Sequence, residues 1–284
     1  MGTGREGTTL SYGRFRFVRA ETDELKEKIY RLRYEVYVEE FGFEKPEDHP
    51  GNLETDAYES CAIHFAALDP NDEVVGTIRL ILHSEKGFPI EEAVEIRFPG
   101  EKPPPEKIAE ISRLAVSHKY RRRHGDGQFG VESYLRASEG GEIPDEGRVP
   151  RKYRKRRTPE IVMGLYQIMY HESKRLGLTH WYMITEDKVY RLFKRFGFVF
   201  HPIGEPVYYH GVRRPYLGVI SEMESALIRE NPVLMKLVLR GLEKEYQPVF
   251  SLQDQLRMMA SFPHFARKGL RFWKGRLVDA RRRD

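Results

Sequence analysis

The chain has 284 residues, which is long enough to bury a sizeable core in one large domain or two small ones. Charged residues make up 32% of it and the mean hydropathy is −0.60, and no uncharged apolar run approaches the ~18 residues that a membrane span needs. The single cysteine, Cys61, excludes an internal disulfide and a multi-cysteine zinc site. Together with the lack of an apolar signal segment after Met1, these features favour the cytoplasm.

The net charge of +5 is distributed unevenly. Residues 119–157 hold 12 basic and 6 acidic side chains, and residues 264–284 hold 8 basic and 2 acidic ones. The rest of the chain therefore carries a net charge of −7. An acidic partner would meet these two segments first, and an acidic carrier protein, a nucleic acid and an anionic membrane surface all fit.

The first two predicted elements are a strand and a helix. Residues 15–19 alternate in polarity, which predicts a short strand. Residues 21–40 predict a helix with Thr22 as its N-terminal cap. Its apolar stripe, at helical spacing, consists of Leu25, Ile29, Leu32 and Val36.

The next segments predict a loop and three strands. Residues 42–58 are polar and rich in proline and glycine, which is typical of a loop. Residues 61–68 and 74–82 predict a hairpin, because turn-forming residues join them. Residues 87–105 read as irregular chain, and residues 107–116 predict a further strand.

The second half of the chain predicts alternating helices and strands. Residues 117–157 are charged and contain several glycines, which is typical of a mobile insertion. A helix is expected over 158–176, because a capping hydroxyl, a proline and an acid stand in its first turn. A strand over 181–185 and a helix over 187–196 follow.

The last predicted strands are residues 198–203 and 216–220, and the chain beyond 221 turns helical in two pieces that break around 246–248. This order of elements predicts an α/β (α+β) fold with mixed strand directions. A doubly wound dinucleotide fold is excluded, because no G-x-G-x-x-G follows the first strand.

The strand over 107–116 carries the sharpest chemical feature, Glu110-Ile111-Ser112-Arg113. Glu110 and Ser112 face the same side of a regular strand, where a carboxylate can accept a proton through a water molecule. A local bulge would bring Arg113 to the same side. The alternative is a surface strand with a structural Glu–Arg pair.

Two arginines stand in otherwise apolar patterns, Arg33 in the first helix and Arg79 in the hairpin. A buried guanidinium needs an acidic partner, and Glu54, Asp56 and Glu110 are available. These residues predict an ionic network that shapes a pocket. The alternative is that each arginine lies at the rim with its charge in water.

Several other features leave alternatives open. The sequence Arg122–Gly127 contains R-x-x-G-x-G, which binds pyrophosphate when it leads into a helix, but no clear helix follows it. The seven basic residues within 148–157 fit a solvated run, a docking patch or a nucleic-acid strip. Cys61 is expected to be a buried structural thiol, and the histidines show no metal-ligand spacing, so we expect no metal. The basic tail, with Phe272 and Trp273, fits a membrane surface and a cover for the core equally well.

Some of these residues recur in the order known from one group of enzymes. They are Arg33-x-x-x-Tyr37, Phe43, Glu54, Asp56, Arg79 and Glu110-x-Ser112-Arg113. Over roughly residues 15–220 the sequence resembles the acyl-homoserine-lactone (autoinducer) synthases of the GNAT N-acyltransferase superfamily. It resembles still more the N-acyl amino acid synthases and the acyltransferases associated with the PEP-CTERM/exosortase system, the last of these at 113–116 and 119–123.

The resemblance implies a GNAT fold, with a mixed central sheet flanked by helices. It implies transfer of a long acyl chain from a thioester to the amine of an amino acid or similar acceptor. The co-substrate would be acyl-acyl carrier protein or acyl-coenzyme A, with no permanently bound cofactor. Acidic carrier protein rather than nucleic acid is then the expected partner, docking at Arg121, Arg122 and Arg123. The expected organisation is a flexible N-terminus over 1–14, a GNAT-like domain over 15–220 and a helical extension with a basic tail over 221–284.

The resemblance also implies roles for single residues. Glu110 would be the base, Ser112 and Arg113 would set the pocket, and the amides of 113–116 would stabilise the oxyanion. The acceptor site and its ion-pair network would comprise Arg33, Tyr37, Phe43, Asp56 and Arg79. The acyl pocket would be lined by Leu114, Val116, Leu165, Ile168, Met169, Met183 and Phe193, for which plain core packing is the alternative.

The sequence departs from the family pattern at positions that bear on the substrate. Phe43 stands where the autoinducer synthases typically have tryptophan, and Leu53 breaks their paired Asp-x-x-Asp, so homoserine-lactone chemistry is not implied. Phe193 stands where many acetyltransferases have a tyrosine acid, with Tyr190 one turn earlier. Two other functions fit the sequence: a GNAT acetyltransferase using acetyl-coenzyme A, and a non-catalytic binder of anionic membrane or nucleic acid.

Overall fold

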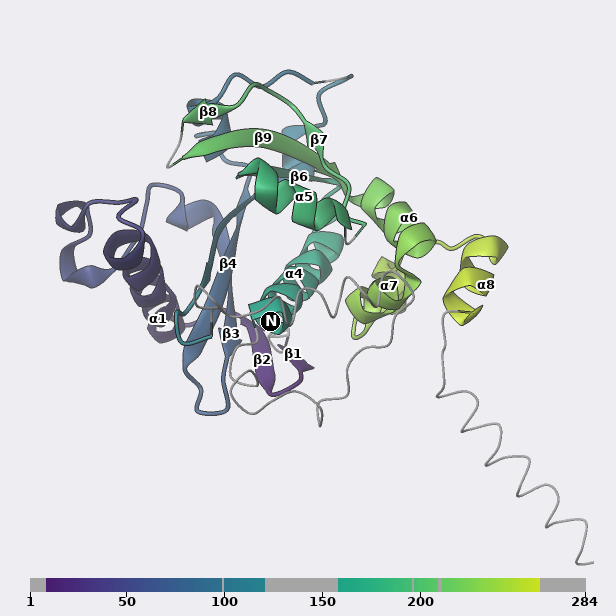
Figure 1. Cartoon of the computed structure of the whole chain (residues 1–284), viewed down its shortest axis with the longest axis horizontal. Helices are drawn as coiled ribbons and strands as arrows, with labels where there is room; N and C mark the ends of the chain where they lie inside the picture. Colours follow the sequence, from purple (N-terminus) through teal and green to yellow (C-terminus); the bar gives the residue numbers. More distant parts are fainter. Residues whose placement is uncertain (1–8, 99, 121–157, 196, 209–210, 261–284) are drawn as a thin grey trace, which may run out of the picture.

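The computed structural model describes residues 9–98, 100–120, 158–195, 197–208 and 211–260. Within these ranges the chain forms a nine-stranded sheet in the order β1-β2-β3-β4-β5-β6-β9-β7, with β8 paired to β9 (Figure 1). Neighbouring strands are antiparallel except β5 and β6, which are parallel. The strands are β1 (Thr9–Tyr12), β2 (Phe15–Arg19), β3 (Ala62–Leu68), β4 (Val74–Leu82), β5 (Ile108–Val116), β6 (His180–Thr185), β7 (His201–Pro202), β8 (Val207–Tyr208) and β9 (Val212–Val219).

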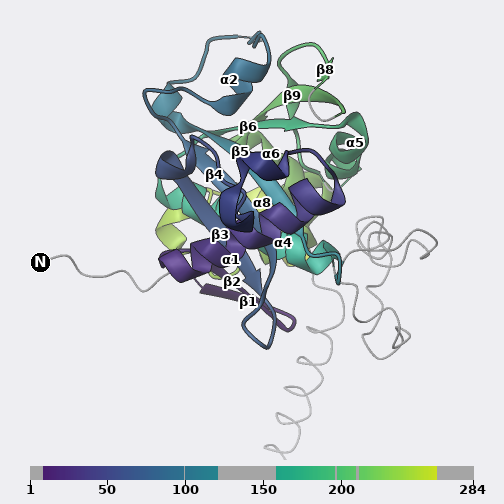
Figure 2. The same cartoon turned by 90° about the vertical axis from the view of Figure 1, so that its left-hand side faces the viewer.

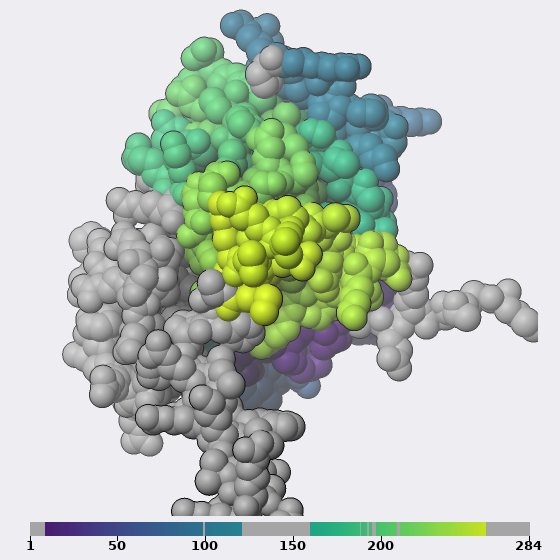
Figure 3. Space-filling view, turned by 90° about the vertical axis from the view of Figure 1, so that its right-hand side faces the viewer, coloured from purple at the N-terminus to yellow at the C-terminus, as the bar shows by residue number. Residues whose placement is uncertain are grey.

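Helices cover both faces of this sheet. The helix α1 and the short α2 lie on one face, and α4 lies on the other (Figures 1 and 2). The helices α6, α7 and α8 gather on the α4 side (Figure 3). The helices are α1 (Asp23–Tyr34), α2 (Pro89–Ala93), α4 (Thr158–Arg175), α5 (Asp187–Arg195), α6 (Ile220–Glu230), α7 (Pro232–Leu239) and α8 (Leu252–Ala260), and α1 continues into a π-helical turn, η1 (Glu35–Glu40).

The helix α1 forms where the sequence predicts it. The side chain of Thr22 accepts a hydrogen bond from the amide of Leu25 at 3.3 Å, which caps the first turn. Three residues of its apolar stripe, Ile29, Leu32 and Val36, are buried against the sheet. The wider η1 turn at its end could not be predicted from the apolar spacing, and it turns Tyr37 toward β5.

Close packing of α4 on the sheet depends on two glycines. A Cβ at Gly76 of β4 would lie 2.5 Å from Ile161, and one at Gly164 of α4 would lie 2.1 Å from Phe17. Ile161 and Phe17 are themselves fully buried. Any larger residue at either glycine would therefore push α4 away from the sheet.

The predicted strands and helices of the GNAT-like region are largely confirmed, within one or two residues at their ends, except that β9 begins at Val212, four residues before the predicted strand over 216–220. The sequence missed β1, α2 and β8, and the prediction of a strand over 198–203 is wrong except at His201–Pro202. The amide of Phe198 bonds to the carbonyl of Phe193 and closes α5, and Pro202 has no N–H to extend the ladder. The mixed α/β fold with a central, mostly antiparallel sheet is as expected.

The C-terminal extension forms three helices within residues 220–260 rather than the two predicted pieces. The additional break falls at Asn231–Pro232, where the side chain of Asn231 caps α7. In the part of the chain that the structure describes, no helix is long and apolar enough to cross a membrane. The predicted insertion beyond residue 120 and the basic tail lie outside the described residues.

Candidate active site

A bulge in β5 organises the site. Arg79 of β4 pairs with Ser112, whereas Thr77 pairs with Ala115, so β5 carries one extra residue between them. Arg113, within the bulge, has a φ of 50°, in the left-handed region. Ser112 and Arg113 consequently both turn toward the α1 face, as the sequence suggested. There Ser112 Oγ accepts a hydrogen bond from Arg79 Nε at 3.0 Å, and Arg113 Nε donates to Glu54 at 2.9 Å.

Glu110 lies two residues before Ser112 on the same side of β5. It is 2% exposed, and its Oε2 accepts a hydrogen bond of 2.9 Å from the amide of Ile90 in α2. Burial raises the pKa of Glu110 to about 7, against the lowering effects of the Ile90 amide, Arg79 and Arg113. A carboxyl with a pKa near neutrality is suited to accept a proton at physiological pH.

Arg33 and Arg79 are 0% and 1% exposed, which excludes the alternative that they lie at a rim. Arg33 pairs with Glu54, and its Nη2 lies 2.9 Å from Glu59. Arg79 forms a two-pronged pair with Asp56 at 2.7 and 2.8 Å and also reaches Glu59 at 2.9 Å. The predicted ionic network is therefore present and is buried.

Arg113 extends this network toward the cavity. Besides Glu54, its guanidinium lies 3.3 Å from Asp56 and 3.5 Å from Glu44. Burial acts to raise the pKa of Glu54, but the charges of Arg33 and Arg113 outweigh it and hold that pKa below its usual value. The carboxylates of the network consequently stay ionised at neutral pH.

Sequence reasoning missed Glu59, which binds both Arg33 and Arg79. His64 of β3 lies behind it, with Nε2 2.8 Å from Glu59 Oε2. Burial lowers the pKa of His64, although Glu59 acts to raise it. The spacing of three acids at 54, 56 and 59 ahead of the hairpin was the available signal. The sequence also offered Glu110 as a partner for the buried arginines. Glu110 instead accepts a hydrogen bond from the amide of Ile90.

An aromatic pair closes one end of the site. The hydroxyl of Tyr37 in η1 donates to the carbonyl of Leu114 at 2.9 Å, and the Tyr37 ring stacks on Phe43 with centroids 6.4 Å apart. The guanidinium carbon of Arg113 lies 5.6 Å from the centre of the Tyr37 ring. That of Arg213, in β9, lies 5.4 Å from the centre of the Phe43 ring.

These groups surround a cavity of about 440 Å³, a size suited to a small molecule. Six residues singled out from the sequence contribute to its wall: Tyr37, Asp56, Arg79, Glu110, Ser112 and Arg113. Arg33 and Phe43 do not line it and instead support residues that do. The remaining lining comes from Ala57, Tyr58, Pro89, Ile90, Glu92, Ala93, Ile111, Ile184 and Arg213. Tyr58, Glu92 and Arg213 had not been predicted.

The sheet opens beside this cavity. The parallel pairing of β5 with β6 runs from Ile108 to Ile111 on β5 and ends opposite Met183 on β6. Beyond that point β5 continues to Val116 and β6 to Thr185 without pairing to each other. The segment expected to supply oxyanion amides, 113–116, borders this opening.

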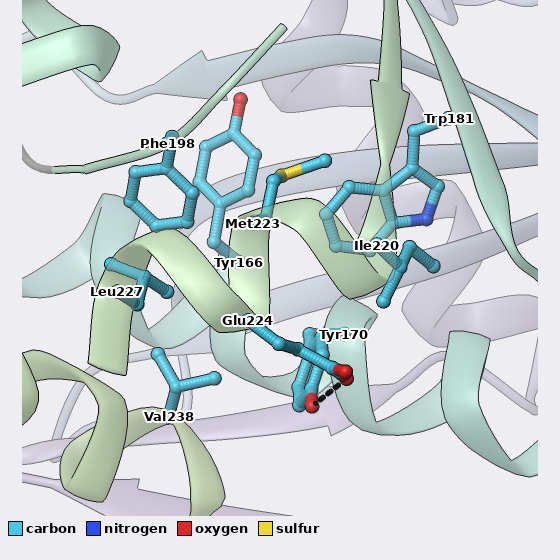
Figure 4. A pocket seen from close by; sticks show the side chains of 9 residues that line it. All are labelled: Tyr166, Tyr170, Trp181, Phe198, Ile220, Met223, Glu224, Leu227 and Val238. Atoms are coloured by element: carbon cyan, nitrogen blue, oxygen red, sulfur yellow. Dashed lines mark hydrogen bonds between the residues drawn. The ribbon is translucent and has the colours of Figure 1, made fainter. Parts of the chain in front are cut away.

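The seven residues expected to line the acyl pocket lie on the α4 side of the sheet. Six are buried in the main core and Leu114 packs against it; none lines the cavity beside Glu110. A second cavity on this side, of about 20 Å³, is lined mainly by aromatic and aliphatic side chains of α4, β6, α6 and α7 (Figure 4). The carboxylate of Glu224 lies in its wall and accepts hydrogen bonds from Tyr170 and Lys174, both at 2.7 Å.

Other predicted features fall away from the site. Arg121, Arg122 and Arg123, the R-x-x-G-x-G motif and the basic run over 148–157 lie outside the described residues. Cys61 is half-buried, and its Sγ bonds to the carbonyl of Tyr58 at 3.3 Å. Among the residues that the structure describes, no three His, Cys, Asp or Glu side chains are grouped to hold a metal ion.

Residues 32–128 match the family model of the acetyltransferase (GNAT) domain. This match indicates an acyltransferase. The matched segment contains the ionic network, the bulge and Glu110, and most of the residues that line the cavity; Ile184 and Arg213 lie outside it. No curated protein matches the chain.

Solved structures to which the chain is similar include those of TofI, BjaI and FeeM. TofI, in a ternary complex with an inhibitor and MTA, is 18% identical with a TM-score of 0.49, covering 76% of this chain and 95% of TofI. BjaI, a CoA-dependent acyl-homoserine lactone synthase solved with MTA, is 17% identical with a TM-score of 0.47, covering 84% of this chain and 92% of BjaI. FeeM, an N-acyl amino acid synthase from uncultured soil microbes, is 13% identical with a TM-score of 0.46, covering 80% of this chain and 99% of FeeM.

Proposed function

We propose that this protein is an N-acyltransferase of the cytoplasm that transfers a long-chain fatty acyl group from a thioester to the amine of an amino acid or similar small acceptor. The observation that carries the proposal is Glu110: a buried carboxyl with a pKa of about 7, in a cavity that adjoins the opening between β5 and β6. The GNAT match over 32–128 supports the reaction class.

The thioester is already activated, so the protein has to align the reactants, remove a proton and stabilise charge. Glu110, as a carboxylate, accepts one proton from the ammonium group of the acceptor, directly or through a water molecule. The amine nitrogen then attacks the thioester carbonyl carbon and forms the C–N bond. The amides of 113–116 stabilise the oxyanion. When the C–S bond breaks, the thiolate leaves and takes up the second proton from nitrogen.

The two substrates would approach from opposite faces of the sheet. The acceptor occupies the charged cavity on the α1 side, and the thioester reaches it through the opening between β5 and β6. The acyl chain would enter the apolar core on the α4 side, near Leu165, Met169, Met183 and Phe193. These residues are closely packed in this structure, so they have to move apart to admit the chain. This placement is supported by the sidedness of β5, whose Ala109 and Ile111 belong to that core.

The donor and its docking also belong to the proposal. The basic segment over 119–157, with Arg121, Arg122 and Arg123, has the charge to attract an acidic acyl carrier protein. Coenzyme A is the alternative carrier of the same thioester. The basic tail over 264–284 would add peripheral contact with a membrane surface.

The test is mass spectrometry of organic extracts from cells that express the protein, beside cells that express Glu110→Gln. A new N-acyl amino acid, absent with the variant, would support the proposal and name both acceptor and chain. The exposed Glu95, which pairs with Arg97 outside the cavity, provides the control Glu95→Gln and should leave the product unchanged.

Thiol release by the purified protein would then separate the donors. Consumption of long-chain acyl carrier protein or acyl-coenzyme A is the expected result. Turnover of acetyl-coenzyme A alone, or undiminished turnover by Glu110→Gln, would contradict the proposal.

A further inference from the structure

The helix α8 exposes an apolar stripe to solvent. Leu252, Leu256 and Met259 follow one another at i, i+4 and i+7, which is the spacing of one helical face. A surface helix normally turns such a stripe toward the core. In α8 these three side chains are instead 74%, 57% and 68% exposed. The helix lies on the surface of the molecule, against α6 and α7 (Figure 3).

The orientation of α8 is fixed by other contacts. Met258 packs against the main core, and so does Phe250, just before the helix. The hydroxyl of Ser251 accepts a hydrogen bond of 3.1 Å from the amide of Asp254, which caps the first turn. The outward direction of the stripe is therefore a property of the folded extension. An exposed group of large apolar side chains of this kind marks an interaction surface.

The sequence after α8 indicates which partner fits this surface. Residues 261–284 hold 8 basic and 2 acidic side chains, together with three phenylalanines and a tryptophan. The helix itself carries one acid and one base, Asp254 and Arg257, which pair with each other at 3.5 Å. An apolar helical face joined to a cluster of cations is typical of segments that lie in the interface of an anionic lipid bilayer.

Other partners fit these features less well. A nucleic acid would attract the basic residues but would gain nothing from three exposed aliphatic side chains. A second copy of the chain would cover the stripe, but it would bring together two segments that each carry six more basic than acidic side chains. An anionic bilayer takes up the apolar side chains and attracts the cations at the same surface.

We infer that α8 is an interfacial anchor, whose stripe of Leu252, Leu256 and Met259 inserts into the surface of an anionic lipid bilayer while residues 261–284 supply the electrostatic attraction. The inference goes beyond acyl transfer, and it extends the peripheral contact proposed for the basic tail to a folded helix. The helices α8 and α1 lie at opposite sides of the molecule (Figure 1). A bilayer that contacts α8 would therefore leave the α1 side, with its charged cavity, uncovered.

The test is binding of the purified full-length protein to lipid vesicles, measured by co-sedimentation. The vesicles contain phosphatidylglycerol and phosphatidylcholine in equal parts, or phosphatidylcholine alone. We expect the wild type to bind the anionic vesicles more tightly, and high salt to weaken that binding. The double variant with Leu252→Gln and Leu256→Gln keeps every charge. Its partition coefficient should fall by about 10- to 100-fold, because two apolar side chains no longer enter the bilayer.

A second variant tests the electrostatic part. Replacing Arg281, Arg282 and Arg283 together by glutamine should lower binding to the anionic vesicles by about 10- to 100-fold and leave binding to phosphatidylcholine unchanged. Tyr208→Gln provides the matched control, because Tyr208 is also an exposed apolar residue but lies in β8, across the molecule from α8 (Figure 1). It should bind vesicles as the wild type does.

The inference is overturned if the double variant binds anionic vesicles as tightly as the wild type, since the basic residues alone would then make the contact. It is also overturned if the wild type binds no vesicles, or if it binds a DNA duplex more tightly than vesicles at the same salt concentration. A dimer that the double variant dissociates, seen by light scattering, would assign the stripe to a second copy and likewise overturn it.

Activity separates this inference from the proposed function. Thiol release from a long-chain acyl-coenzyme A or acyl carrier protein, without vesicles, should be the same for the wild type and the double variant. Absence of thiol release in both would contradict the proposed transferase and leave the vesicle result standing. Loss in the double variant alone would show that the stripe serves the reaction rather than a bilayer, which overturns the inference.

Discussion

The two faces of the sheet around β5 differ in polarity: one carries charged side chains and the other apolar ones. On the α1 side, Arg79, Arg113 and Asp56 line a cavity of about 440 Å³. Arg33, Glu54 and Glu59 lie behind these residues and complete the ionic network. On the α4 side, a cavity of about 20 Å³, room for about one water molecule, lies among aromatic and aliphatic side chains (Figure 4). Because side chains alternate along a strand, β5 supplies both faces, with Glu110 on one and Ile111 on the other.

The difference shows where this fold departs from regular geometry. The α4 side is a closely packed core on a regular helix, and it follows from apolar periodicity together with the two glycines, Gly76 and Gly164, that let α4 approach the sheet. The α1 side depends on the bulge at Arg113 and the π-helical turn that carries Tyr37. Both irregularities direct polar groups at one cavity, so the polar groups of the candidate site gather where the backbone is irregular.

The largest effect is expected from breaking the charged face. Arg33→Met leaves Glu54 and Glu59 without one of their buried partners, and we expect the free energy of unfolding to fall by about 3–5 kcal/mol. Chemical denaturation measures this change. Arg31→Met, which removes an exposed pair with Glu27, is the control and should cost at most about 1 kcal/mol. If Arg33→Met lowered the free energy of unfolding no more than Arg31→Met does, the buried network would contribute no more to stability than an exposed ion pair.

Breaking the apolar face should cost somewhat less. Leu227 of α6 is 3% exposed and lines the small cavity, so Leu227→Ala should lower the free energy of unfolding by about 2–5 kcal/mol. Leu252 of α8 is 74% exposed, and Leu252→Ala should change it by less than about 0.5 kcal/mol. A small effect at Leu227 would mean that the extension contributes little to the core.

Glu110→Gln should abolish activity and yet make the stability of the protein less dependent on pH. In the folded protein the pKa of Glu110 is raised to about 7 from an ordinary value of 4.5. Below pH 4.5 the group is protonated in both folded and unfolded states and changes nothing. Between pH 4.5 and 7 the carboxyl is protonated in the folded state but ionised in the unfolded state. The free energy of unfolding of the wild type therefore falls as pH rises through this range, by about 3 kcal/mol in all. Chemical denaturation at pH 5 and pH 8 measures this effect. The free energy of unfolding of Glu110→Gln, relative to that of the wild type, should be higher at pH 8 than at pH 5.

The pH dependence of activity should show the smallest effect. In the proposed mechanism Glu110 acts as a carboxylate, so kcat/KM should rise with pH and level off above about pH 7. At pH 6 it should be about tenfold below the plateau. A profile that stays flat from pH 5 to pH 8 would exclude Glu110 as the base.

Much of the fold follows from local pattern. The strands and helices with clear periodicity, such as β3, β4 and α4, lie within one or two residues of their predicted bounds. The shared face of Glu110 and Ser112 follows from the period of a strand. The short α2 and the two-residue β8 could not be predicted, and the strand that contains β7 was predicted too long, because the positions of these elements depend on contacts with distant parts of the chain.

The candidate site shows the same limit. The arginines were recognisable because a charge in an apolar pattern requires a partner. The identity of the partner was not, since Glu59 stands among several acids of the same loop. Arg213 was invisible in the sequence, because only the folding of β9 beside the Phe43 loop brings it to the cavity.

The left-handed backbone at Arg113 places two conflicting demands on one residue. Its φ of 50° suits glycine, and any other side chain there costs about 1 kcal/mol or more. The ion pair with Glu54 requires a long cationic side chain at the same point. Substitution by glycine would therefore relax the backbone while discarding the contact. Because removing one partner of the buried Glu54 carboxylate costs more than the left-handed backbone does, the ion pair keeps an arginine at a position whose backbone alone would favour glycine.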